Sequence, residues 1–194
     1  MNYLAHAYLS FNHPEVLAGN MISDFIKGKQ QFNFPDEVRK GIRLHRLIDS
    51  FTDSHPVNRE AKAVFRADYG LYSGAFLDIV YDHFLATDAG IFPADELGHF
   101  AQSTYSKLDT QIGILPDNFL RIFPYMKNQN WLLNYRYRQG IENSFRGLVH
   151  RASYLHDYET INVLFDKNYT TLQAGYRQFF PELKAYAEEQ FSML

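Results

Sequence analysis

Cysteine is absent from the 194-residue sequence, and this absence excludes several classes of protein at once. Without thiols the chain forms neither a disulfide scaffold nor a thiolate zinc site, and it has no cysteine nucleophile. No apolar run approaches the roughly 20 residues that a membrane-spanning helix needs. The first residues, Met1 to His6, lack the basic and apolar regions of a signal peptide. We therefore expect a cytoplasmic protein without a membrane segment.

An excess of positive charge is also lacking. The chain has 19 Lys and Arg against 22 Asp and Glu, and its net charge is −3 with His neutral. Nucleic-acid binders gain much of their affinity by neutralising phosphates, so we expect no nucleic-acid partner. Glycine-rich nucleotide loops, the serine-hydrolase elbow and the His-Glu-x-x-His zinc motif are missing as well. What the chain does supply is 8 His and many carboxylates, which are groups that bind metals and transfer protons.

The apolar residues follow a helical period. They recur at steps of three and four between Pro35 and His55, and again between Leu71 and Ala86. Proline followed by an acid marks several expected helix starts, because proline suits the first helical position and acids favour the positive end of the helix dipole. Strand patterns are poor. We predict an all-α fold, with residues 1–194 forming a single compact domain of about eight helices.

The segment from Ile42 to His55 concentrates polar groups of catalytic type. His45, Asp49 and Asp53 are spaced four apart and therefore share one face of a helix, beside an apolar stripe. Polar side chains that lie next to the buried face of a helix are well placed to line a cleft. The alternative is a solvated face on which Arg46 pairs with Asp49, and spacing alone leaves both interpretations open.

A second group of candidates lies where acids occur in apolar surroundings. Asp82 and His83 belong to a helix that is apolar over much of its circumference, and a lone buried carboxylate is expensive. They are expected to bind a cation, to pair with an arginine or to cap a helix. Asp24 has similar apolar neighbours, whereas His6 on its own is more often a satisfied core histidine. The dipeptide His156-Asp157 has no second ligand at helical spacing.

Five short blocks, in order along the chain, carry a family resemblance. They are Asn2-Tyr-Leu-Ala-His6, Gly19-Asn20-x-x-x-Asp24-Phe25, His45-Arg46-x-Ile48-Asp49-x-x-Thr52-Asp53, Tyr81-Asp82-His83-Phe84-Leu85 and Trp131-Leu132. With these blocks the chain resembles the acyl carrier protein phosphodiesterase family, also called acyl carrier protein hydrolase. The resemblance implies a helical fold similar to the HD-type metal-dependent phosphohydrolases. It also implies hydrolysis of the phosphodiester that joins 4′-phosphopantetheine to a serine of holo-acyl carrier protein.

The resemblance and the residue patterns together give an expected site. The expected metal ligands are His6, Asp24, His45, Asp82 and His83. An imidazole and carboxylate set suits Mn²⁺, or Mg²⁺, better than a soft ion. We expect Arg46 to stabilise the developing phosphoryl charge and Asp49 or Asp53 to orient the attacking water.

Basic side chains gather in two segments and offer docking surfaces for an acidic carrier protein. The first contains Arg39, Lys40, Arg43 and Arg46, and the second runs from Lys127 to Arg151. Two other functions stay open: an HD-type phosphohydrolase acting on a nucleotide or another small phosphodiester, and a non-catalytic helical binding module.

Overall fold

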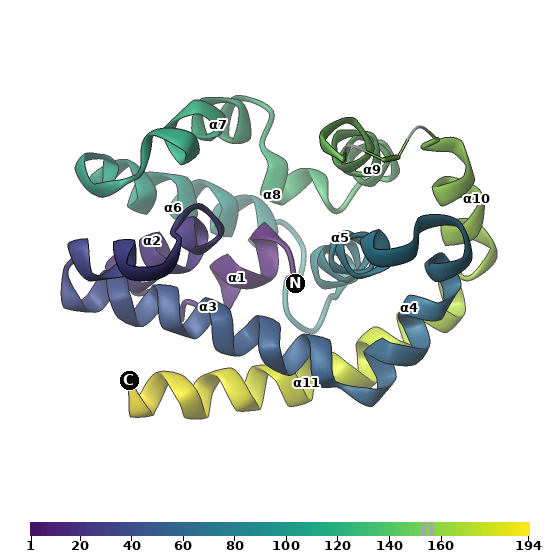
Figure 1. The fold of residues 1–194 in the computed structure, drawn as a ribbon, viewed down its shortest axis with the longest axis horizontal. Helices are drawn as coiled ribbons and strands as arrows, with labels where there is room; N and C mark the ends of the chain where they lie inside the picture. The colour runs from purple at the N-terminus through teal and green to yellow at the C-terminus, as the bar shows by residue number, and fades with distance from the viewer. Residues whose placement is uncertain (153, 156) are drawn as a thin grey trace.

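Helices make up all the regular structure in the computed structural model, which describes residues 1–152, 154–155 and 157–194 (Figure 1). The α-helices are α1 (Tyr3–Tyr8), α2 (Pro14–Ile22), α3 (Asp36–Ser54), α4 (Pro56–Tyr69), α5 (Ser73–Thr87), α6 (Glu96–Thr110), α7 (Asp117–Asn128), α8 (Trp131–Asn134), α9 (Arg138–Arg151), α10 (Glu159–Lys167) and α11 (Tyr169–Met193). Four 3₁₀ turns join them: η1 (Ser23–Phe25), η2 (Gly28–Asn33), η3 (Gly70–Tyr72) and η4 (Ile112–Ile114). The all-α prediction is confirmed.

The expected helix starts agree with the structure. Helices α2 and α4 begin at Pro14 and Pro56, and α3 begins at Asp36, directly after a proline. The described residues nevertheless contain eleven α-helices and not about eight. Helices α1 and α8 have only six and four residues, which is too short for a hydrophobic period to be visible in the sequence.

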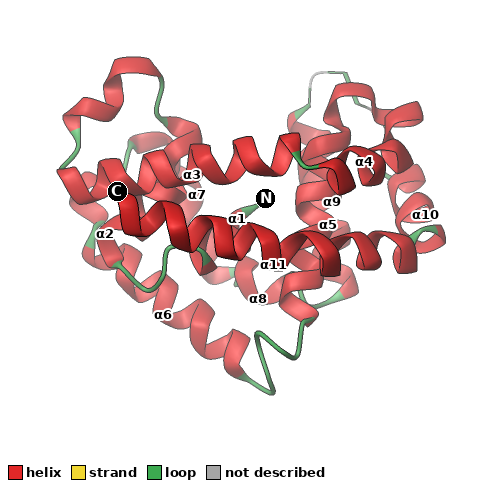
Figure 2. Cartoon of the chain, turned by 90° about the horizontal axis from the view of Figure 1, so that it is seen from below, coloured by secondary structure: helices red, strands yellow, loops and turns green. Residues whose placement is uncertain are grey.

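Helix α1 lies inside the molecule and is packed against α2 and α5. Its residues Leu4 and Ala5 are fully buried. The long helices α3 and α11 run side by side along one face (Figure 2). The buried hydrophobic residues join into one cluster that extends through most helices. No helix among the described residues is both long and apolar enough to span a membrane.

Helices α2 and α3 touch through their main chains at Gly19 and Gly41. A Cβ atom built on Gly19 would lie 2.0 Å from the carbonyl oxygen of Val38, and one on Gly41 would lie 2.1 Å from that of Val16. Only glycine allows this approach. The contact holds the second half of α2, shortly before η1 begins, against the first turns of α3.

Candidate metal centre

Two histidines from different helices converge on one carboxylate. His6 of α1 places Nε2 3.2 Å from Asp49 Oδ1, and His45 of α3 places Nε2 3.1 Å from Asp49 Oδ2. The two imidazole rings are stacked, with centroids 3.9 Å apart and planes inclined by 15°. One potential ligand atom from each of the three residues lies within 4.8 Å of the others, which is a spacing that a single metal ion can bridge.

Asp24 joins the group from η1. Its Oδ1 lies 3.2 Å from His45 Nε2. The Asp24 side chain is 73% exposed, whereas that of His45 is 7% exposed, so Asp24 forms the solvent side of the group. The group is therefore buried on the histidine side and open on the carboxylate side.

Asn20 orients both histidine rings. Its side-chain Oδ1 lies 2.8 Å from His6 Nδ1, and its main-chain oxygen lies 2.8 Å from His45 Nδ1. The amide orientation is fixed because Asn20 Nδ2 donates to the His6 carbonyl and to Ser10 Oγ. Both Nδ1 atoms therefore carry a proton, and both Nε2 atoms face the carboxylates. Polar partners of this kind commonly orient metal-binding histidines.

The electrostatics of the group favour a cation. Burial and the neighbouring His45 lower the pKa of His6 to about 4, against the attraction of Asp49. Burial alone would lower the pKa of His45 too, but Asp24 and Asp49 raise it to about 9. The pKa of Asp49 is lowered by His45 and His6 in spite of burial. At neutral pH His6 is thus neutral, and its Nε2 lone pair faces a carboxylate lone pair.

This contact between two acceptors fits a metal ion. The buried His6 Nε2 forms no hydrogen bond with any described atom, although Asp49 is close. Once His45 has released its Nε2 proton, a cation between the imidazole nitrogens and the carboxylate oxygens would satisfy all of these lone pairs. Two imidazoles with one or two carboxylates are compatible with a divalent metal.

The N-terminal amine adds a positive charge next to the group. Met1 N lies 3.0 Å from Asp78 and 3.8 Å from Asp49, and the Met1 side chain is fully buried. Burial would lower the pKa of this amine, but Asp78 and Asp49 raise it. Sequence reasoning did not find this contact or the role of Asn20, because both depend on helix packing. The one available signal was a polar Asn20 in an otherwise apolar stretch of α2.

The structure does not bring Asp82 and His83 into the group. The Asp82 carboxylate accepts hydrogen bonds from the main-chain N–H groups of Asn2, Leu4 and Ala5, at 3.2, 2.7 and 3.3 Å. It therefore caps the start of α1, a role that the sequence had left open. The His83 ring is 2.7 Å from the Tyr135 carbonyl and 3.2 Å from the Tyr169 hydroxyl.

Two further candidates point elsewhere. Arg46 donates to Gln31 Oε1 at 2.9 Å and does not pair with Asp49 among the described residues. Asp53 is exposed and pairs with Lys62 at 2.6 Å. In the dipeptide His156-Asp157, His156 lies outside the described residues.

Asp157 has a structural partner at the start of α10. It accepts a hydrogen bond from the main-chain N–H of Glu159 at 2.7 Å.

The comparisons with known proteins agree with one another. The family "Acyl carrier protein phosphodiesterase" matches residues 1–183. Acyl carrier protein phosphodiesterases from Escherichia coli O157:H7 (strain EC4115 / EHEC) and from Escherichia coli (strain K12 / DH10B) are each 31% identical over 191 residues, which cover 98% of this chain and 99% of the relative. No solved structure gives a significant match, so the likeness to HD-type hydrolases stays a prediction. The chain belongs to the acyl carrier protein phosphodiesterase family.

Proposed function

We propose that this protein is a cytoplasmic, metal-dependent phosphodiesterase, formed by residues 1–194 as one catalytic domain. Its substrate is holo-acyl carrier protein. Water adds to phosphorus, the bond from phosphorus to the serine oxygen breaks, and that oxygen takes up a proton. The products are apo-acyl carrier protein and 4′-phosphopantetheine. Membership of the family supports the reaction. The observation that carries the metal dependence is the convergence of His6, His45 and Asp49.

His6, His45 and Asp49 are the proposed metal ligands, with Asp24 on the open side. When bound, a divalent cation polarises a phosphoryl oxygen and lowers the pKa of nearby water. Mn²⁺ is the proposed ion, and Mg²⁺ the second choice, because the donors are imidazole and carboxylate.

Asp24 is suited to orient the attacking water. His45 holds the pKa of Asp24 below its usual range, so the carboxylate stays ionised at neutral pH and accepts a hydrogen bond. Its exposed position leaves room for a water molecule on the side away from His45. A hollow of about 370 Å³, lined in part by Asp24, lies next to it.

The carrier protein is proposed to dock on η2 and the neighbouring face of α3. In the first basic segment Arg39 and Lys40 already pair with Asp36 and Glu37. Exposed cationic side chains without an ion pair among the described residues remain beside them: Lys27, Lys29, Arg43 and Arg46.

In the second basic segment Lys127 pairs with Asp109, and only Arg146 and Arg151 lack an ion pair or hydrogen bond among the described residues. Arg136 donates to the main-chain oxygens of Ala86, Phe92 and Ala94, and Arg138 pairs with Asp166. These contacts occupy Arg136 and Arg138, and the two free arginines that remain are fewer than the four cations without an ion pair around η2 and α3.

The test is to incubate the protein with holo-acyl carrier protein and Mn²⁺ and to follow the mass of the carrier protein. Loss of the 4′-phosphopantetheine mass from the carrier protein is the expected result. Asp49→Asn should abolish this conversion, while Asp53→Asn, on the same face of α3, should leave it unchanged. Unmodified holo-protein together with hydrolysis of nucleotides would contradict the proposal in favour of the HD-type alternative. No turnover and no stabilisation by Mn²⁺ would favour a binding module.

A further inference from the structure

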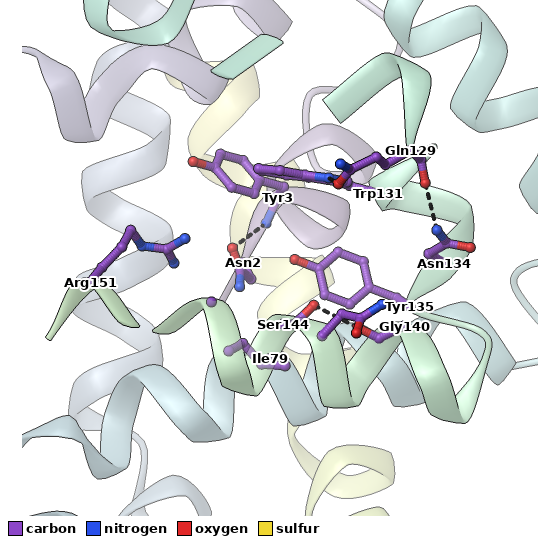
Figure 3. Close-up of a pocket in the computed structure, with 12 residues that line it drawn as sticks. Asn2, Tyr3, Ile79, Gln129, Trp131, Asn134, Tyr135, Gly140, Ser144 and Arg151 are labelled. Carbon is purple, nitrogen blue, oxygen red and sulfur yellow. Dashed lines mark hydrogen bonds between the residues drawn. The ribbon is translucent and has the colours of Figure 1, made fainter. Parts of the chain in front are cut away.

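A hollow of about 550 Å³ lies beside the start of α1, between α8 and α9 (Figure 3). Tyr3 and Trp131 line one side, Tyr135 and Ser144 line the other, and Arg151 stands at one end. The size falls within the usual range for small-molecule sites.

This hollow adjoins a smaller one that reaches Asp24, on the open side of the metal centre. The smaller hollow beside Asp24 shares five lining residues with the larger one: Asn2, Tyr3, Ile79, Trp131 and Arg151. The two hollows therefore adjoin, and a ligand with one end at Asp24 can extend towards α9. Arg151 is the one Lys or Arg among the lining residues of either hollow.

The walls of the larger hollow combine aromatic and apolar surface with uncharged polar groups, and they carry almost no charge. Its lining contains no carboxylate. Gln129 Oε1 accepts from Trp131 and Asn143 Oδ1 accepts from Gln139, but the side-chain amide nitrogens of Gln129 and Asn143 have no hydrogen-bond partner among the described residues. The Tyr135 hydroxyl also has no hydrogen-bond partner among the described residues. Burial raises the pKa of Tyr135 well above its usual value, so the hydroxyl is a neutral donor.

The face of α9 that lines the hollow is built from small and polar residues. Gly140, Asn143, Ser144, Gly147 and Arg151 recur at steps of three and four along the helix. A helix face that packs against a core normally carries large apolar side chains. At Gly147 their absence leaves space, and amides and hydroxyls surround it; at Gly140 it instead lets α9 touch the main chain of Asn134.

We propose that this hollow binds the pantetheine arm of the substrate, an inference that rests on the proposed function. The arm is flexible and uncharged, and it carries two amides and a hydroxyl group, which match the free amide and hydroxyl groups of the walls. A purely apolar chain would leave these groups unpaired, at a cost in free energy. In the larger hollow, a nucleotide base with further phosphates would meet Arg151 as the one cation among the lining residues. Arg151, at the junction of the hollows, is positioned to contact the phosphate.

Gly147→Leu tests the proposal. Outside the main chain of its own helix, a Cβ atom on Gly147 would meet only Arg151 Nη1, at 3.6 Å, and Gly147 lines the hollow, so a larger side chain at this position should fill part of it. The matched control is Gly98→Leu in α6, where a Cβ atom has no neighbour within 4 Å. Mn²⁺ affinity should be unchanged in both variants, which shows that the fold and the metal centre survive.

Two measurements decide the outcome. Gly147→Leu should raise KM for holo-acyl carrier protein about tenfold or more and weaken binding of free 4′-phosphopantetheine by a similar factor, since overfilling a packed site is costly. Gly98→Leu should change neither. Asn143→Leu, which removes one amide at an exposed position without adding bulk, should weaken binding about threefold to tenfold and covers the case in which Gly147→Leu fails to fold.

The possible failures are distinguishable. Wild-type affinity for 4′-phosphopantetheine and wild-type KM in folded Gly147→Leu and Asn143→Leu would overturn the pantetheine site while leaving the phosphodiesterase function intact. A different result is that the wild-type protein binds 4′-phosphopantetheine, with binding weakened by Gly147→Leu and Asn143→Leu, and yet never cleaves holo-acyl carrier protein. That result would support the site and overturn the proposed function.

Discussion

Replacing Asn20 should damage metal binding although Asn20 is not itself a proposed ligand. The side chain is fully buried and makes three hydrogen bonds: with His6 Nδ1 at 2.8 Å, with the His6 carbonyl at 2.9 Å and with Ser10 Oγ at 3.1 Å. In Asn20→Ala all three are lost. At about 1 kcal/mol for each, the free energy of unfolding should fall by about 3 kcal/mol. A domain of ordinary stability survives this loss.

The effect on the metal should be separate from the effect on stability. Without Asn20 Oδ1, the His6 ring loses the hydrogen bond that directs Nε2 towards Asp49 and keeps only its stacking on His45, whereas His45 keeps its bond to the main-chain oxygen of residue 20. Loss of such an orienting partner typically weakens metal binding about 10-fold to 100-fold. Calorimetric titration of the metal-free protein with Mn²⁺ measures this change directly.

The matched control is Asn58→Ala. Asn58 is equally buried and donates to the Thr52 carbonyl at 2.7 Å, away from the proposed ligands. It should lower stability by about 1–2 kcal/mol and leave Mn²⁺ affinity unchanged. An Asn20→Ala variant that loses stability but keeps an Mn²⁺ affinity within about twofold of wild type would show that Asn20 does not orient His6 for a metal.

Three further outcomes are expected. The pKa of His45 is raised to about 9, so Mn²⁺ must displace a proton at neutral pH. Calorimetry at pH 7 in buffers of different ionisation enthalpy should therefore show the release of about one proton, and the affinity for Mn²⁺ should rise from pH 7 to 9 and then level off. An Mn²⁺ affinity that does not change with pH would contradict this assignment. For the same reason, protonated His45 should stabilise the metal-free protein fully below about pH 6.5, and this contribution to the free energy of unfolding should be lost as the pH rises through about 9. Urea unfolding at several pH values measures it, and a contribution that grows with pH would contradict the raised pKa. Gly19→Ala places a methyl group 2.0 Å from the Val38 carbonyl and should prevent stable folding or lower the melting temperature strongly. The control Gly98→Ala, whose new methyl group has no neighbour within 4 Å, should raise the free energy of unfolding by about 0.5–1 kcal/mol. Equal melting temperatures of the two variants would refute the close helix contact.

Helix content and helix starts were predictable because they depend on local chemistry. Proline at the first position of α2 and α4 and the apolar period of α3 are visible in the sequence itself. The pair His45 and Asp49 was equally visible, because residues four apart on a helix share a face.

The rest of the group depends on tertiary packing. The local pattern around His6 is that of an ordinary core histidine, and the family resemblance alone placed it among the expected ligands; its position next to His45 depends on how the helices pack. Asp82 shows the opposite case: a carboxylate in an apolar helix has the same sequence pattern whether it binds a cation or caps a neighbouring helix. In this fold Asp82 meets the free N–H groups at the start of α1.

The contact between Gly19 and Gly41 bears on how this site tolerates sequence change. Asn20 and Asp24 follow Gly19 on one side of the contact, and His45 follows Gly41 on the other, so the spacing between these groups is set by touching main chains. Core side chains elsewhere can be exchanged and repacked without altering that spacing. The relative placement of α2 and α3 at the site is therefore robust to drift in most of the hydrophobic core, yet it is vulnerable at two positions that carry no functional group at all.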